Sequence, residues 1–286
     1  MMLHIADTDS LSHEFLTQNL LIKKYLMSLR GDSALHRSAI SKESIDLTIT
    51  SPPYNLGISY ASHTDDMTYA QYLAFCKIWL SNCLIWSKSS GRLCLNVPLD
   101  QNKYGRRSIG ADLNQLAQEV GWSYQTTIIW NEQNISKRTA WGSWRSASAP
   151  YVITPVELII VFYKNDWKKP HKGISDLTKE EFIQWTNGMW TFPGESKKRI
   201  GHPAPFPREL AKRCIKLFSY VGDMILDPFV GSGTTMIEAI NHHRFALGLD
   251  IEPSYIELAL KRIKKECHLW QNEEFIEFFI LPKINE

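Results

Sequence analysis

Apolar positions recur along the chain with two spacings. A spacing of three to four residues predicts helices over residues 11–29, 69–86, 109–120, 208–218, 234–242 and 253–266. Short apolar runs bounded by Gly, Pro or polar residues predict strands over residues 45–50, 92–97, 126–130, 157–163, 224–227 and 245–250. Because strands and helices alternate, the pattern predicts an α/β fold with a parallel sheet and helices on both faces.

Two segments interrupt this alternation. Residues 131–155 are polar, basic and aromatic without regular periodicity, which predicts a loop. Residues 165–201 also lack sustained periodicity, and they hold Trp167, Trp185 and Trp190. We expect the elements that confer substrate specificity to lie in these two segments.

Composition places the chain among ordinary globular proteins. Its 286 residues suit one large domain, and 44% hydrophobic with 22% charged residues argues against a disordered chain. The longest apolar runs are of strand length, too short to span a membrane. The N-terminus lacks a basic segment followed by an apolar one, so no signal peptide is predicted. We therefore expect no membrane association and a cytoplasmic location.

Cysteine and histidine positions give no sign of a metal site. The five cysteines are odd in number and form no Cys-x-x-Cys pair, which predicts reduced thiols in the core: Cys76, Cys83, Cys94, Cys214 and Cys267. His242 and His243 end a predicted helix and have no Cys or carboxylate at ligand spacing. No metal is predicted.

Positive charge gathers in one stretch, although the formal net charge is only +2. Residues 195–216 hold seven basic and two acidic side chains. Such a run fits a polyanionic partner, and it fits a solvated helix face equally well.

The first chemical motif lies between a predicted strand and a predicted helix. It reads Asp227-Pro228-Phe229-Val230-Gly231-Ser232-Gly233-Thr234-Thr235. Two glycines one residue apart allow a tight turn and a close approach of a ligand to the backbone. Asp250 ends the next predicted strand, where nucleoside-binding α/β proteins keep an acid that accepts hydrogen bonds from ribose hydroxyls.

Two other nucleotide-binding loops fit this motif less well. A phosphate-binding P-loop ends in Gly-Lys-Ser/Thr, and this loop has no Lys. A dinucleotide loop has a third small residue where Met236 stands here. The leading Asp227-Pro228 also suits a cationic ligand better than a pyrophosphate.

The second motif, Thr50-Ser51-Pro52-Pro53-Tyr54-Asn55, ends a predicted strand. Paired prolines can simply terminate a strand. The chemical interpretation is that the Ser51 hydroxyl oxygen and a backbone carbonyl of the Pro52-Pro53 turn hold both hydrogens of an exocyclic amino group. The nitrogen lone pair is then free to attack an activated methyl group. Tyr54 offers a ring on which an extruded base can stack.

Together these motifs resemble those of the S-adenosylmethionine-dependent amino-methyltransferases of restriction–modification systems. The catalytic motif precedes the cofactor motif, which is the permuted order of the β class. The similarity covers about residues 31–262, nearly the whole chain.

The resemblance implies further site residues. Asp32, in Gly31-Asp32-Ser33, takes the place of an acid near the cofactor adenine. His202 and Pro203 begin a segment that resembles the motif closing the methionine end of the cofactor pocket. The implied cofactor-binding set is Asp32, His202, Pro203, Asp227, Pro228, Phe229, Gly231, Ser232, Gly233, Thr234, Thr235 and Asp250, and the implied catalytic set is Ser51, Pro52, Pro53 and Tyr54.

The resemblance also implies an architecture and partners. The expected fold is a Rossmann-like, seven-stranded, mostly parallel sheet with one reversed strand. Residues 1–164 would form the catalytic half of the domain, residues 201–286 its S-adenosylmethionine-binding half, and residues 165–200 a target-recognition insert between them. The expected partner is duplex DNA in a prokaryotic cytoplasm. A cognate restriction endonuclease and a homodimer are further partners that this family suggests.

Candidate DNA contacts come from polar and basic residues of the irregular segments and the catalytic turn. They are Asn55, Lys137, Arg138, Arg145, Lys197, Lys198 and Arg199. Any one of them also fits a solvated surface residue. As a set, interleaved with Trp141, Trp144, Trp167 and Trp190, they favour nucleic acid.

Ser51 bears on the target base. Serine at this position is typical of cytosine-N4 enzymes of the resembling class, and Asp or Asn of adenine-N6 enzymes. The sequence therefore favours N4-methylation of cytosine, with N6-methylation of adenine as the alternative. Methylation of RNA or of protein glutamine is less favoured, because of the permuted order and the long Trp-rich insert. A nucleic-acid-binding protein without catalysis stays a further alternative, and a nicotinamide oxidoreductase fits least.

Overall fold

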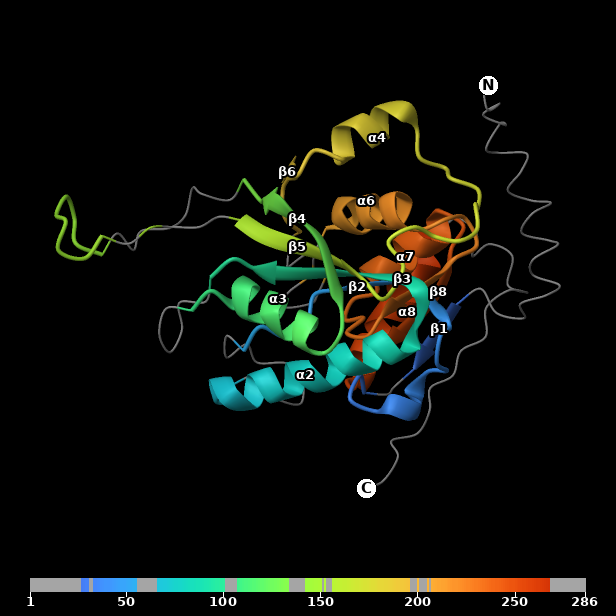
Figure 1. The fold of residues 1–286 in the computed structure, drawn as a ribbon, viewed down its shortest axis with the longest axis horizontal. Coiled ribbons are helices and arrows are strands. Elements are labelled where there is room, and N and C mark those ends of the chain that lie inside the picture. The colour runs from blue at the N-terminus through green and yellow to red at the C-terminus, as the bar shows by residue number, and fades with distance from the viewer. Residues whose placement is uncertain are drawn as a thin grey trace.

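The chain folds around one mixed sheet (Figure 1). The computed structural model describes residues 27–30, 33–55, 66–100, 107–133, 142–150, 152, 156–195, 200, 205 and 207–267. Eight strands lie in the order β1-β8-β7-β2-β3-β5-β4-β6. In chain order their bounds are β1 Met27–Arg30, β2 Ile45–Thr50, β3 Ser87–Pro98, β4 Ser123–Asn131, β5 Val156–Tyr163, β6 Met189–Thr191, β7 Met224–Asp227 and β8 Phe245–Leu249.

One strand of this sheet runs against the others. Strand β5 pairs antiparallel with both β3 and β4, whereas the other neighbouring pairs are parallel. This confirms the predicted mostly parallel, Rossmann-like sheet with one reversed strand. The apolar pattern predicted six of the eight strands that the described residues form. The other two are β1, beside β8, and the short strand β6, beside β4.

Helices cover both faces of the sheet, as predicted. They are α2 Tyr69–Trp86, α3 Ile109–Glu119, α4 Lys179–Trp185, α6 Arg208–Phe218, α7 Thr234–Asn241 and α8 Pro253–Glu266, with a 3-10 turn η1 at Arg37–Ala39. Figure 1 shows α2 and α3 on one side of the sheet and α4 and α6 on the other. The predicted bounds of α2, α6 and α8 agree with the structure.

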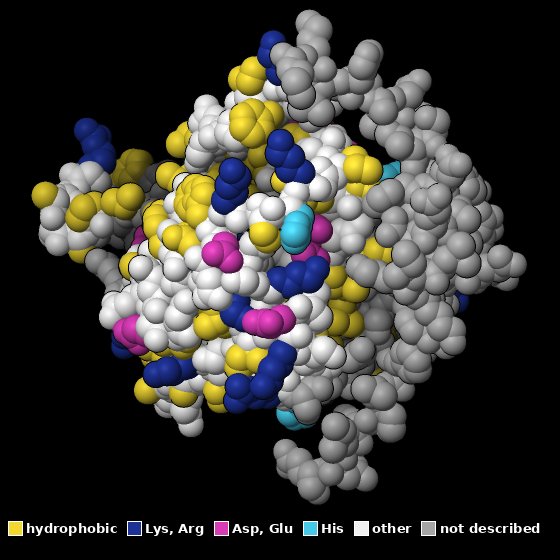
Figure 2. Space-filling model, turned by 45° about the vertical axis from the view of Figure 1, so that its right-hand side comes forward, with side chains coloured by type: hydrophobic (Ala, Val, Ile, Leu, Met, Phe, Trp, Pro, Cys, Tyr) yellow, Lys and Arg dark blue, Asp and Glu magenta, His cyan; other side chains and the backbone are white. Residues whose placement is uncertain are grey.

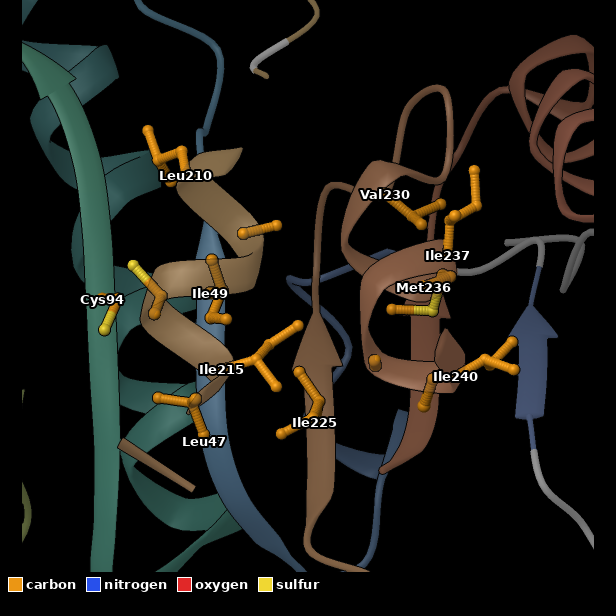
Figure 3. Packing of buried hydrophobic residues seen from close by; sticks show 14 of the residues in the cluster. Leu47, Ile49, Cys94, Leu210, Ile215, Ile225, Val230, Met236, Ile237 and Ile240 are labelled. Carbon is orange, nitrogen blue, oxygen red and sulfur yellow. The ribbon is translucent and has the colours of Figure 1, made fainter. Parts of the chain in front are cut away.

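Side-chain alternation along the strands divides the core in two. Leu47 and Ile49 of β2 point to the face covered by α6, α7 and α8 (Figure 3). Leu93 and Leu95 of β3 point to the opposite face, where α2 and α3 pack. Successive strand residues face opposite sides of a sheet, so each central strand contributes side chains to both cores. All five cysteines are buried thiols in these cores, as predicted.

Two sequence predictions of local structure are wrong. The apolar spacing predicts that residues 27–29 end a helix, but they lie in β1, which pairs in parallel with β8. The remainder of that predicted helix lies outside the described residues. Residues 165–201, expected to lack regular structure, contain α4 and β6. A seven-residue helix and a three-residue strand are too short to produce a visible period.

No helix in the described ranges combines the length and apolarity that crossing a bilayer would need.

Candidate functional site

The two chemical motifs meet at one edge of the sheet. Strands β2 and β7 are parallel neighbours, and each motif begins where its strand ends, at Thr50 and Asp227. Carboxyl ends of adjacent parallel strands lie at the same edge, which is where open α/β sheets bind ligands. The Thr50 hydroxyl donates a hydrogen bond of 3.0 Å to Asp227 Oδ1, so the two motifs are joined directly.

Asp227 organises the turn that follows it. Its carboxylate accepts hydrogen bonds from the Phe229 backbone N–H at 3.1 Å and from the Thr235 hydroxyl at 2.7 Å, in addition to Thr50. The side chain is only 1% exposed, and this burial raises its pKa to about 6 despite the hydrogen bonds. Asp227 therefore shapes the loop from beneath and presents no open surface to a ligand.

The glycine turn needs its glycines. Gly231 and Gly233 have φ angles of 48° and 80°, in the left-handed region that glycine adopts without strain. A Cβ atom at Gly233 would lie 2.9 Å from Cβ of Ala259 in α8, closer than such atoms approach. Gly233 thus permits both the turn into α7 and the close packing of α8 against it.

Asp250 lies beside this turn at the end of β8. Its Oδ2 accepts a hydrogen bond from the Gly231 backbone N–H at 2.9 Å, and its Oδ1 accepts one from the Glu252 backbone N–H at 3.0 Å. Each carboxylate oxygen can accept a second hydrogen bond, so the group can also receive ribose hydroxyls. An acid at the mouth of a glycine turn fits the nucleoside of S-adenosylmethionine.

Burial divides the predicted cofactor residues into two groups. Phe229 and Asp250 keep part of their surface exposed at the sheet edge. Pro228, Ser232, Thr234 and Thr235 are buried. Arg262, which the sequence interpretation missed, donates from Nη1 to the Ser232 carbonyl and to the hydroxyls of Ser232 and Thr234. These buried residues hold the loop in shape, and the exposed ones can face the ligand.

The catalytic motif forms a compact hydroxyl cluster. Ser51 is partly exposed, and its Oγ lies 2.5 Å from the Tyr54 hydroxyl. Tyr54 is 9% exposed, and its hydroxyl lies 3.0 Å from the Asn96 carbonyl oxygen. Pro52 is buried and Pro53 partly exposed. Because the Tyr54 hydroxyl is engaged inside the protein, the ring is fixed in place next to Ser51.

Asn96 and Glu157 complete this cluster, and the sequence interpretation missed both. The Asn96 side-chain amide donates to the Tyr54 hydroxyl at 3.1 Å and to Glu157 Oε2 at 2.5 Å. Burial, followed by the nearby Glu132, raises the pKa of the Glu157 carboxyl to about 7. In the sequence, the signal for Glu157 is a single carboxylate at the start of an otherwise apolar strand.

The predicted DNA contacts fall into three groups. Asn55 is 2% exposed, and its amide donates to the Met67 carbonyl at 2.7 Å, so it braces the segment leading into α2. Arg145 is exposed next to Trp144, whose surface is 69% exposed. The other candidates lie outside the described residues: Lys137, Arg138, Lys197, Lys198 and Arg199. So do Trp141 and the predicted cofactor-binding residues Asp32, His202 and Pro203.

Two of the tryptophans expected to favour nucleic acid differ in exposure. Trp167 is 54% exposed, which leaves its ring accessible. Trp190 is 1% exposed and packs in the core with Phe192, so it has no surface to offer a base. Because β6 has only three residues, the sequence shows no alternation that would mark Trp190 as buried.

Intramolecular ion pairs account for three of the seven basic residues in residues 195–216. Lys216 lies 2.6 Å from Glu181, Arg213 lies 2.8 Å from Glu209, and Arg208 pairs with Glu238. Lys and Arg are interspersed with Asp and Glu on the face that Figure 2 shows. For these three residues, contacts within the fold explain the positive charge better than an external polyanion does.

Comparison with known proteins decides the family. A family model for N6 and N4 methyltransferases, described as DNA methylase, matches residues 45–261, which contain both motifs. The chain belongs to the N6/N4 DNA methylase family. Over 161 residues this methylase is 63% identical to the type II methyltransferase M.MjaVI of Methanocaldococcus jannaschii, covering 56% of this chain and 83% of that protein. Over 231 residues it is 30% identical to M.HpaI of Haemophilus parainfluenzae, covering 79% and 70%.

Solved structures agree with this membership. The methylase resembles TTHA0409 of Thermus thermophilus, solved in complex with S-adenosyl-L-methionine, with a TM-score of 0.70 and 27% identity over 91% of this chain and 100% of that one. It shares its fold with the cytosine-N4-specific PvuII DNA methyltransferase, with a TM-score of 0.65 and 19% identity over 90% and 96%. The methylase is thus an S-adenosylmethionine-dependent DNA methyltransferase of the restriction–modification kind.

Proposed function

We propose that this DNA methyltransferase methylates the exocyclic N4 of a cytosine flipped out of duplex DNA. The observation that carries the proposal is Ser51, a hydroxyl and not a carboxylate or amide, partly exposed at the end of β2 beside the glycine turn. Serine at this place is the feature that favours cytosine over adenine. Adenine N6 is the alternative, since one oxygen acceptor can take the place of another.

The residues of this edge have separable roles in the proposed reaction. S-adenosylmethionine, when bound, supplies a methyl group on a positively charged sulfur. Asp250 and the glycine turn would hold its nucleoside beside Ser51. Ser51 Oγ and a backbone carbonyl of the Pro52-Pro53 turn would accept the two amino hydrogens and aim the nitrogen lone pair. The gain comes mainly from positioning, because the buried cluster around Tyr54 fixes these groups before substrate arrives.

We further propose where DNA is recognised. Strand β4 ends and β5 begins at the same sheet edge as Ser51, so residues 131–155, which connect them, start and finish beside the site. Residues 165–200, between a catalytic half (1–164) and a cofactor half (201–286), form the proposed target-recognition insert. Residues 131–155, within the catalytic half, belong to the same proposed recognition region. The exposed Arg145 and Trp144 support this assignment. A type II system would pair the enzyme with a restriction endonuclease, and pull-down with that protein would test it.

The decisive experiment identifies the product. Duplex DNA of varied sequence is incubated with the protein and S-adenosylmethionine, and the digested nucleosides are analysed by mass spectrometry. We expect N4-methylcytosine. N6-methyladenine would overturn the base assignment and keep the family chemistry. Absence of any methylated nucleoside would favour a DNA-binding protein without catalysis.

A matched variant links the product to Ser51. Ser51→Ala should still bind S-adenosylmethionine in calorimetry, since Ser51 does not belong to the glycine turn. It should lose roughly 100-fold to 1000-fold in the rate of methyl transfer, the usual cost of removing one positioned polar group. Wild-type turnover by this variant would refute the role of the hydroxyl.

A further inference from the structure

A carboxylate reaches the catalytic edge because one strand is reversed. Strand β5 is antiparallel to β3, and Glu157 near its amino-terminal end pairs with Pro98 near the carboxyl end of β3. On a parallel strand the same residue would lie at the opposite edge of the sheet. The reversal therefore places Glu157 beside the Ser51–Tyr54 cluster, 103 residues away from Tyr54 in sequence.

Three oxygen atoms lie in succession from Ser51 through the buried Tyr54 to the partly exposed Glu157. Ser51 Oγ is 2.5 Å from the Tyr54 hydroxyl oxygen, and that oxygen is 3.5 Å from Glu157 Oε2. The second distance is at the limit for a hydrogen bond, and the Tyr54 hydroxyl also has the Asn96 carbonyl oxygen as an acceptor at 3.0 Å. The hydroxyl must therefore turn from that carbonyl toward Glu157 to pass its proton on. Asn96 holds both inner groups, since its amide donates to the Tyr54 hydroxyl and to Glu157 Oε2.

We propose that Glu157 is the final acceptor of the proton that the target amino group loses, and that the hydroxyls of Ser51 and Tyr54 conduct it there. This inference rests on the proposed function, because it requires an amino group at Ser51. Neither hydroxyl is a strong enough base to keep a proton at neutral pH.

The proton transfers balance without any further reactant. The amino nitrogen gains a methyl group and loses one proton to Ser51 Oγ. The Ser51 hydroxyl proton passes to Tyr54 oxygen, and the Tyr54 proton passes to Glu157 Oε2. Both hydroxyls are thereby restored, and the carboxylate becomes a carboxylic acid. It returns the proton to water before the next turnover.

The surroundings of Glu157 suit an acceptor that works near neutral pH. Burial and the nearby Glu132 raise its pKa to about 7, and hydrogen bonds from Asn96 and Tyr54 oppose the shift. The titratable groups that act on it most strongly are Tyr54, after β2, and Glu132, after β4; Asn96 of β3 is neutral. A base with a pKa near the operating pH can both take up and release a proton.

The test measures single-turnover methyl transfer across pH 5 to 9 (a range of about four units around the expected value). In the wild-type enzyme the rate should rise as the pH passes about 7, where Glu157 ionises. Glu157→Gln should be slower by about 100-fold and lose this rise. Tyr54→Phe, which interrupts the path and keeps the carboxylate, should lose the rise as well.

Glu132→Gln provides the discriminating control. It removes a negative charge that raises the pKa of Glu157, so the rise in rate should move to lower pH. A purely structural role of Glu157 would not produce that displacement. A rise that persists in Glu157→Gln, or stays in place in Glu132→Gln, would overturn the proposal.

A second readout needs no turnover. In carbon-13 NMR of the enzyme without cofactor, one glutamate carboxyl should titrate near pH 7 and be missing in Glu157→Gln. Titration of that carboxyl at its ordinary pH would contradict the inference. N6-methyladenine as product would refute the cytosine assignment alone, because the pH profile applies to either base. Calorimetry with S-adenosylmethionine confirms that each variant is folded.

Discussion

At the scale of single residues, Asp227 shows how one buried motif residue can hold several segments together. Its carboxylate joins the end of β2, the glycine turn and the start of α7 through Thr50, Phe229 and Thr235. Removing it from water costs free energy whenever it is ionised, which is why its pKa rises to about 6. The glycine turn and the end of β2 therefore share one buried acid.

This acid predicts a pH dependence of stability. Folding raises the pKa of Asp227 from 3.8 to about 6, so the folded state favours the protonated form. Its contribution to the free energy of unfolding is full below about pH 4 and is lost as the pH rises through about 6. The loss amounts to about 3 kcal/mol, from a shift of roughly two pKa units.

Asp227→Asn tests this dependence, since an amide can keep accepting from Thr50 and donate to Thr235. Urea denaturation without cofactor should show the variant gaining stability relative to wild type between pH 4 and 7, by about 3 kcal/mol. A difference between the two proteins that stays constant over this range would mean that Asp227 is charged at little cost in the folded state.

At the scale of elements, helices and strands with a strong apolar period were predicted well, whereas short elements were missed. The bounds of α2, α6, α8 and β7 follow from their apolar spacing. Strand β1 was missed because its four residues gain their structure from pairing with β8, and such pairing overrides local pattern. Helix α4 did carry a readable sign, the capping box of Thr178 and Glu181.

The glycine turn gives a prediction at this scale. Gly233→Ala combines a left-handed φ of 80° with a Cβ placed 2.9 Å from Ala259 Cβ, so α7 and α8 must move apart. We expect stability to fall by about 1–3 kcal/mol in thermal or urea unfolding, and S-adenosylmethionine affinity to fall at least tenfold in calorimetry.

Gly188→Ala is the matched control. The nearest atom to a Cβ there is the Thr127 carbonyl oxygen at 3.9 Å, an ordinary contact, and Gly188 carries no left-handed φ. It should leave both measurements close to wild type. Equal effects of the two substitutions would show that the turn tolerates a side chain and that its glycines serve another purpose.

At the scale of the whole molecule, the site is a property of topology. Ser51, Asp227 and Asp250 end parallel strands, so their meeting at one edge could be predicted once the motifs were read. Glu157 could not, because its place depends on the reversal of β5 and on pairing with β3. Arg262 acts from α8 on the glycine turn, another contact that no local pattern contains.

Cations at the carboxyl ends of the parallel strands and cations at their amino ends should contribute unequally to DNA binding. Arg145 belongs to the segment that leaves β4 and returns to β5 at the edge of Ser51. Lys42 is exposed just before β2, at the amino ends of the parallel strands and so at the opposite edge. A duplex engaged at the catalytic edge should contact the first cation and not the second.

The dependence of DNA affinity on salt concentration measures which of these two cations contacts DNA. Each phosphate contact contributes a slope of about −0.9 to log K against log salt. Arg145→Ala should reduce the magnitude of the slope by about 0.9 and leave S-adenosylmethionine affinity unchanged, whereas Lys42→Ala should change neither. If Lys42→Ala lowers the slope and Arg145→Ala does not, DNA must approach the other edge. The base would then have no route to Ser51, and the proposed recognition region would be wrong.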